Sequence, residues 1–168
     1  MEIINGERLV LGTCYYPEHW DESLWRNDLK RMLENGIEVI RIAEFAWSKI
    51  ERYEGVFNYD FFDRFLDVAA DMGMKVIFCT PTATPPAWLT EKYPEVLNAN
   101  MDGVLYRHGG RRHYNYNSPK YQELTTIIVE KSASHYAKHP AIIGWQIDNE
   151  LNCEKNEFYS ESDTIAFR

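Results

Sequence analysis

The chain has 168 residues, of which 45% are hydrophobic and 14% aromatic, and it carries a formal net charge of −8. This length is sufficient for one globular domain with a hydrophobic core. The acidic balance disfavours nucleic acid or an anionic membrane as a partner, because both bind clustered Lys and Arg side chains.

Predicted strands alternate with amphipathic helices in the first half of the chain. Residues 9–16 predict a strand. Asp21 is the expected N-cap of a helix. Apolar residues recur at helical spacing up to residue 33, and Gly36 is expected to end the helix. A second strand is predicted at 39–42 and runs into a loop at 43–48. An apolar helical stripe over 61–72 stops at Gly73, and 75–80 predicts a third strand.

The second half begins with an unusually long predicted loop, from Pro81 to Asn117, of the kind that is usually functional. Ser118 and Pro119 then predict the start of a long helix. Its apolar side carries Tyr121, Leu124, Ile127, Ile128 and Tyr136. A fourth strand is predicted from Ile142, and 164–168 resemble the first turn of another helix. This β-α alternation predicts a parallel sheet with crossover helices.

Polar side chains follow each predicted strand. The apolar run from Ile142 to Ile147 is typical of a buried parallel strand and leads directly into Asn149 and Glu150. At the C-terminal end of a barrel strand, such residues face the active site; they are also compatible with a solvated strand end. The other strand ends supply Tyr16, Glu18 and His19, then Arg41, Glu44 and Trp47, then Thr80, Thr82, Thr84 and Trp88.

These groups favour a neutral polyhydroxylated ligand over a phosphorylated one. Hydroxyl groups need paired donors and acceptors, and the CH face of a sugar stacks on aromatic rings. A doubly wound nucleotide-binding sheet would fit the chain length, but no Gly-rich phosphate turn follows any predicted strand.

Five segments resemble glycoside hydrolase family 42, the β-galactosidases, in order and at family spacing. They are GTCYYPEHW at 12–20, RIAEFAWS at 41–48, TPTATPPAWL at 80–89 with YPE at 93–95, GRRHY at 110–114 and QIDNE at 146–150.

The resemblance implies a fold and an activity. The expected fold is an α/β (β/α)8 TIM barrel, of which residues 1–168 cover about the first four β/α units as the N-terminal part of a glycoside hydrolase catalytic domain. The expected reaction is hydrolysis of terminal β-D-galactosides, including galacto-oligosaccharides, by double displacement. The family implies no cofactor, no nucleic-acid or membrane partner, and a homotrimer for the full-length enzyme.

The resemblance also implies three site residues. Glu150 matches the general acid/base, Asn149 the amide that binds the hydroxyl beside the anomeric carbon, and Arg111 a substrate-binding arginine. A retaining glycosidase needs a carboxylic acid to protonate the leaving oxygen and a second carboxylate about 5–5.5 Å away to attack the anomeric carbon. From the sequence alone, Arg111 is also compatible with a loop cation paired to a surface carboxylate.

Two departures from the family pattern follow. The family nucleophile is a glutamate at the end of the seventh strand, and no Glu in this chain matches it by motif; Glu44 is expected to bind sugar or to pair with a buried partner such as Arg41. Some family members hold a structural zinc through cysteines. Of those positions only Cys153 carries a cysteine, with Asn115 at another and Phe, Ser and Asp within 157–163, so we predict no zinc and a free Cys153 thiol.

The cysteines, the N-terminal residues and the histidines limit the classes of protein that fit the sequence. Cys14 and Cys79 are expected to be small buried hydrophobes, and the odd, widely spaced cysteines favour a reducing cytoplasm. The first residues do not resemble a secretory signal, and no apolar run approaches the ~18 residues of a membrane span. His19, His113 and His139 lack metal-ligand spacing.

Two alternatives stay open. One is another retaining glycosidase of the same clan, acting on a different sugar. The other is a non-catalytic half-barrel. In either case the 168-residue chain by itself is expected to be inactive and poorly soluble, because half of a barrel would leave two unpaired strand edges.

Overall fold

The computed structural model describes residues 9–110, 113–151, 153 and 157–168. The chain forms two compact units. Unit 1 draws its described residues from 1–43, 58–80 and 136–147, and unit 2 draws its own from 44–57, 81–135 and 148–168.

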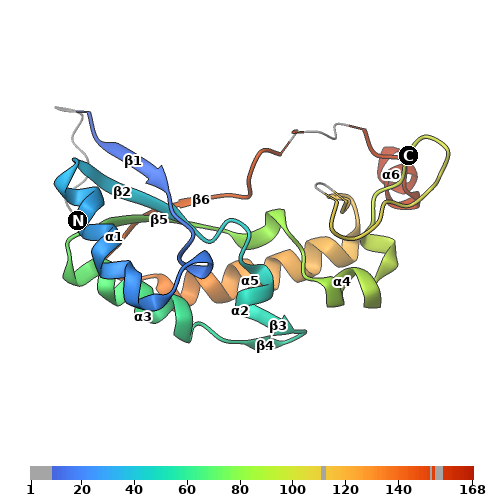
Figure 1. Ribbon diagram of the computed structural model, residues 1–168. Coiled ribbons are helices and arrows are strands. Elements are labelled where there is room, and N and C mark those ends of the chain that lie inside the picture. Colours follow the sequence, from blue (N-terminus) through green and yellow to red (C-terminus); the bar gives the residue numbers. More distant parts are fainter. Residues whose placement is uncertain (1–8, 111–112, 152, 154–156) are drawn as a thin grey trace. The chain divides into compact units, whose positions relative to one another are not determined.

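Unit 1 is built on a parallel sheet with the strand order β1-β2-β5-β6 (Figure 1). Two helices pack beside it along one face (Figure 1), with contacts from α1 to β2 and from α3 to β5. The elements are β1 (Leu11–Cys14), η1 (Pro17–His19), η2 (Glu22–Leu24), α1 (Trp25–Glu34), β2 (Ile37–Ile42), α3 (Asp60–Asp71), β5 (Lys75–Cys79) and β6 (Ile142–Gln146).

The predicted start and stop of the first helix are confirmed. The Asp21 carboxylate accepts a hydrogen bond of 2.9 Å from the backbone N–H of Ser23, although the first turn, η2, is a 3-10 helix that leads into α1. Gly36 follows α1 with φ of +77°, a conformation that costs a residue with a Cβ atom about 1–2 kcal/mol.

Aromatic packing forms the core of unit 1. Trp25 and Phe65 meet edge to face, with ring centroids 5.1 Å apart, and the side chains of both are buried. Phe78 on β5 contacts Tyr136 and Trp145. These contacts bury aromatic side chains of α1, α3 and β5, and such burial is the main source of stability for a helix-covered sheet.

The two outer strands of the sheet are more exposed than the sequence predicts. All four residues of β1 are exposed, and all five of β6 are half-buried. Each of these strands has only one neighbour in the sheet, whereas β2 and β5 each have two. The expected burial of Cys14 and of the strand from Ile142 is therefore wrong; Cys79, on the inner strand β5, is buried as expected.

Unit 2 contains short helices where the sequence predicts two loops. The segment 43–48 runs into α2, and the stretch Pro81–Asn117 contains three short helices. A two-stranded hairpin follows α2. The elements are α2 (Trp47–Ile50), β3 (Glu51–Tyr53), β4 (Val56–Phe57), η3 (Pro81–Ala83), α4 (Ala87–Lys92), η4 (Pro94–Val96), α5 (Pro119–Tyr136) and α6 (Glu161–Phe167).

The core of unit 2 is centred on Trp47 and Tyr121. Trp47 is fully buried and donates a hydrogen bond of 2.7 Å from its indole N–H to the Glu51 carboxylate. Tyr121, in the first turns of α5, stacks on Tyr114 with centroids 4.8 Å apart. The predicted apolar side of α5 is confirmed apart from Ile127, which is 36% exposed.

The last helix, α6, begins at Glu161, three residues before the predicted turn. A capping box explains this start: the Ser160 side chain and the Asp163 side chain each bond the other's backbone N–H. Among the described residues, none of the helices combines the length and the apolar character that crossing a membrane requires.

Candidate active site

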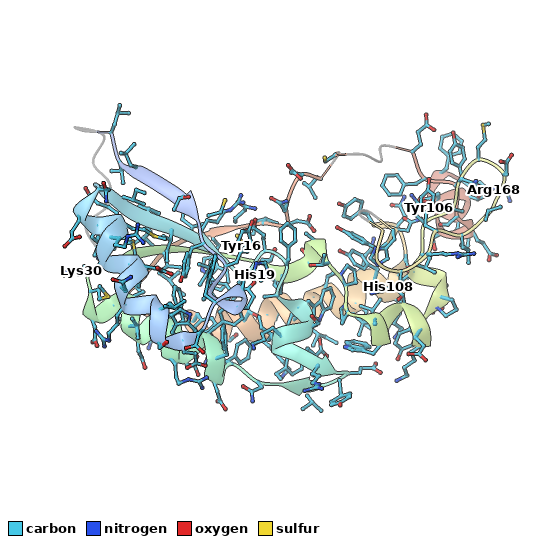
Figure 2. All side chains as sticks on the ribbon, viewed as in Figure 1. Tyr16, His19, Lys30, Tyr106, His108 and Arg168 are labelled. Atoms are coloured by element: carbon cyan, nitrogen blue, oxygen red, sulfur yellow. The ribbon has the colours of Figure 1, made fainter. Side chains whose placement is uncertain are left out.

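Arg41 connects the C-terminal ends of three strands in unit 1. Its guanidinium donates a hydrogen bond of 2.8 Å to Oε1 of Gln146 on β6 and one of 3.0 Å to Sγ of Cys14 on β1. After β1, the ring of Tyr16 stacks on that of His19 with centroids 5.2 Å apart (Figure 2).

Asn149 and Glu150 belong to unit 2, immediately after the end of unit 1. Glu150 is exposed and Asn149 is half-buried, while Asp148 before them is 5% exposed. Asp148 and Glu150 both have left-handed backbones, with φ of +52° and +46°. Such a conformation is uncommon for residues other than glycine and clusters at functional sites.

The Asp148 carboxylate fixes the start of this segment. Oδ2 accepts a hydrogen bond of 2.7 Å from the hydroxyl of Thr82, and Oδ1 accepts one of 2.6 Å from the backbone N–H of Asn149. The sequence places Thr82 and Asp148 at two strand ends but gives no sign of their direct contact. Of the predicted site residues, Arg111 lies outside the described residues.

A cavity of about 600 Å³ lies within unit 2. It is lined by Phe45, Ser48, residues 83–87, residues 108–110 and His113. Its volume is in the range of small-molecule pockets, roughly 300–1,000 Å³. Thr82, which donates a hydrogen bond to Asp148, directly precedes the lining residues 83–87. One short segment therefore both contacts Asp148 and lines the cavity.

His113 lines this cavity and is only 4% exposed. Its Nδ1 contacts the backbone carbonyl of Gly110, and within the described part of the chain its Nε2 has no hydrogen-bond partner. Burial lowers the pKa of His113 below its ordinary value and outweighs the contact with the Gly110 carbonyl, which raises it; the neighbouring His108 lowers it further. His113 is therefore a neutral imidazole near neutral pH. His108 accompanies it in the same loop (Figure 2) and contacts the hydroxyl of Thr90.

The positions compared above with a zinc site carry a hydrogen-bonded cluster. Asn115 donates to Oδ2 of Asp163 at 2.6 Å and also bonds the Ser160 hydroxyl, while Asn117 donates to Oδ1 of Asp163 at 2.8 Å. Cys153 forms no disulfide bond. The described residues contain no group of three or more His, Cys, Asp or Glu arranged to hold a metal ion; the absence of zinc stays a prediction.

Glu44 is 1% exposed, so a carboxylate is buried directly after the β2 strand. Its expected pairing with Arg41 stays a prediction.

The family model for β-galactosidases of glycoside hydrolase family 42 matches residues 14–168. The chain belongs to this family. The expected family and the expected fold class, the first part of a TIM barrel, are confirmed by this match and by the solved relatives below.

Proteins similar in sequence to this chain are named β-galactosidases, in agreement with the family match. The chain is 42% identical over 159 residues to β-galactosidase Bga of Halorubrum lacusprofundi, covering 94% of this chain and 23% of that protein. It is 45% identical over 144 residues to β-galactosidase BgaA of a Thermus species, covering 86% of this chain and 22% of that protein. The chain therefore spans about a quarter of the length of these relatives.

Solved structures show the same relationship. The β-galactosidase of the psychrophilic Marinomonas ef1 superposes with a TM-score of 0.91 at 42% identity, over 95% of this chain and 24% of that one. A catalytic mutant of the family 42 β-galactosidase Gan42B from G. stearothermophilus superposes with a TM-score of 0.87 at 34% identity, over 94% and 23% of the two chains.

Proposed function

We propose that the full-length protein carrying this chain is a retaining β-galactosidase that hydrolyses terminal β-D-galactosides, including galacto-oligosaccharides. The observation that carries the proposal is the family match over residues 14–168, which includes Asn149 and Glu150 in the segment that follows β6. Residues 1–168 supply the N-terminal part of the catalytic barrel. The proposed enzyme needs no cofactor, acts in the cytoplasm and is a homotrimer.

Glu150 is the proposed general acid/base. As the bond between the anomeric carbon and the leaving oxygen breaks, its electron pair stays on that oxygen, which takes the proton of Glu150. A second carboxylate, supplied by a part of the protein outside this chain, bonds the anomeric carbon. Glu150 then removes a proton from the water that releases the sugar. The exposure of the Glu150 side chain is compatible with contact to a substrate.

Asn149 and Arg111 are the proposed sugar-binding residues. An amide at position 149 can both donate to and accept from the hydroxyl beside the anomeric carbon, and such bonds strengthen in the transition state. Arg111 provides a permanently charged donor for sugar oxygens. The 168-residue chain by itself lacks the second carboxylate in this scheme, and we expect it to be inactive.

Hydrolysis of nitrophenyl glycosides by the full-length protein tests the activity and the sugar. We expect the highest kcat/KM for the β-D-galactoside among β-D-galactoside, β-D-glucoside and α-D-galactoside. Proton NMR of the first product is expected to show β-galactose before mutarotation. Preference for another sugar would favour a different glycosidase of the clan, and α-galactose as the first product would contradict a retaining mechanism.

A further inference from the structure

The segment from Asp148 to Glu150 has a backbone that needs external support. Two of its three residues are left-handed, with φ of +52° at Asp148 and +46° at Glu150. Asp tolerates this region better than most residues, because its short polar side chain can hydrogen-bond locally. The longer side chain of Glu gives no such advantage. Such conformations cost of order 1–3 kcal/mol each and persist where the surroundings fix them.

Asp148 supplies part of this support through both of its carboxylate oxygens. Oδ1 accepts the backbone N–H of Asn149 at 2.6 Å, and Oδ2 accepts the hydroxyl of Thr82 at 2.7 Å. The carboxylate is buried, as is Thr82 at 6% exposed. Hydrogen bonds to an ionised carboxylate are stronger than neutral ones, and burial strengthens them further.

Thr82 is in turn fixed to the long helix α5. The hydroxyl of Tyr121 donates a hydrogen bond of 2.9 Å to the backbone carbonyl of Thr82. Burial raises the pKa of Tyr121 well above its ordinary value, with further contributions from Tyr114 and Asp148, so the hydroxyl keeps its proton and acts as a donor near neutral pH. Tyr121 itself is stacked against Tyr114 in the core of unit 2.

We propose that Asp148 and Thr82 are positioning residues: the bridge from Tyr121 through Thr82 and Asp148 to the Asn149 backbone orients Glu150 for proton transfer to the leaving oxygen. The proposal rests on the acid/base role given to Glu150 under the proposed function. In this proposal both residues act through the backbone of the segment that carries Glu150, rather than by contact with the substrate. Their effect is on alignment, and a misplacement of about 1 Å can cost about 100-fold in rate.

Replacement of the Thr82 hydroxyl tests this bridge with little change in side-chain shape. In the full-length protein, Thr82→Val is expected to lower kcat/KM for lactose, whose leaving group needs protonation, by about 10- to 100-fold. For dinitrophenyl β-D-galactoside, whose leaving group needs no protonation, we expect kcat/KM, which reports the first step, to fall by less than about 3-fold. Thr82→Ser, which keeps the hydroxyl, is expected to restore most of the lactose activity.

Thr90→Val is a matched control. Thr90 is also 6% exposed and its hydroxyl is also hydrogen-bonded, to the Ala87 carbonyl and the His108 ring, but it has no bond to Asp148. We expect any loss in this variant to be equal for the two substrates. If Thr82→Val fails to fold, Tyr121→Phe removes the next hydrogen bond of the bridge. We expect this variant to lose less activity than Thr82→Val, with the loss again larger for lactose than for the dinitrophenyl substrate.

Equal losses on the two substrates, or no loss, in Thr82→Val and Tyr121→Phe would overturn the positioning role. Glu150→Ala, measured beside them, separates this outcome from failure of the proposed function. If Glu150→Ala loses lactose activity selectively and the bridge variants do not, only the positioning role fails. If Glu150→Ala shows no such selectivity, the acid/base assignment fails and the positioning role fails with it.

Discussion

Nδ2 of Asn115 donates a hydrogen bond of 2.6 Å to Oδ2 of Asp163, across 48 positions of the sequence. The same carboxylate accepts the side chain of Asn117 and the backbone N–H and hydroxyl of Ser160. The segment before α5 is thereby joined to the first turn of α6. The family resemblance places zinc cysteines at the positions of Asn115, Ser160 and Asp163. In this chain the amide, hydroxyl and carboxylate at these positions form hydrogen bonds with one another.

The Asp163 cluster predicts a loss of local stability in acid. Burial by itself would raise the pKa of Asp163, but hydrogen bonds, that of Asn117 first, outweigh it and lower the pKa below its ordinary value. The stabilisation is therefore complete above the ordinary aspartate pKa of about 3.9 and is lost as the pH falls through the lower folded-state pKa. Hydrogen exchange of the α6 amides, normalised for the chemical rate, is expected to lose protection only below about pH 4.

Asp163→Ala is expected to remove the capping box and the bonds from Asn115 and Asn117. A lost cap costs typically about 1 kcal/mol, equivalent to about 5-fold less protection of the α6 amides at neutral pH. Glu161→Ala is the control, since Glu161 lies in the same turn but is exposed. Equal protection in the two variants would remove the cluster from this role.

Glu51→Ala is expected to destabilise the hairpin that follows α2. The Glu51 carboxylate is 3% exposed and accepts the Trp47 indole N–H at 2.7 Å and the Gly55 backbone N–H at 2.8 Å. Removing it leaves two donors without an acceptor, at about 1–3 kcal/mol for each one that stays buried. Thermal unfolding of the full-length protein and hydrogen exchange of 47–57 measure the effect.

Glu54→Ala is the comparison for Glu51. Glu54 lies three positions further on, at the surface of the same hairpin, where it pairs with Lys92 and Tyr93. Surface ion pairs contribute little, so we expect a smaller loss than in Glu51→Ala. A larger loss at Glu54 would show that the buried carboxylate is not the main support of the hairpin.

The length of α1 and α3 could be predicted because their signals are local. Apolar positions at helical spacing mark both, and Gly36 and Gly73 follow them with φ of +77°. At Gly36 no side chain or backbone atom would obstruct a Cβ, so conformation alone requires the glycine.

Gly36→Ala is therefore expected to cost about 1–2 kcal/mol, through the left-handed backbone. Gly36→Asn is expected to cost less, because Asn tolerates that region. Chemical or thermal unfolding of the two variants checks the order. An Ala variant as stable as the Asn variant would contradict the account of this helix end.

Other features could not be predicted because they depend on contacts distant in sequence. The exposure of Cys14 follows from the edge position of β1, and the order of strands in a sheet cannot be read from the strands themselves. The hairpin of β3 and β4 is too short for a periodic pattern, and the backbone carbonyl of Glu51 accepts a hydrogen bond from the indole N–H of Trp88, 37 positions away.

The candidate site shows the same division. Asn149 and Glu150 could be proposed as site residues from a strand end and a family motif. The contact of Asp148 with Thr82 joins residues 66 positions apart and has no local signal.

Glu150→Ala in the full-length protein tests the central claim, that Glu150 is the acid/base of a retaining β-galactosidase. General acid catalysis contributes typically about 10²–10⁴-fold, so kcat/KM for lactose is expected to fall by about that factor, with a much smaller loss of kcat/KM for dinitrophenyl β-D-galactoside. The kcat for the dinitrophenyl substrate is expected to fall, because the attack of water on the covalent intermediate loses its base. Azide is expected to restore turnover of the activated substrate and to yield β-galactosyl azide. Glu161→Ala, which changes an exposed carboxylate on α6, is expected to behave as the wild type. An unchanged lactose rate in Glu150→Ala would contradict the assignment.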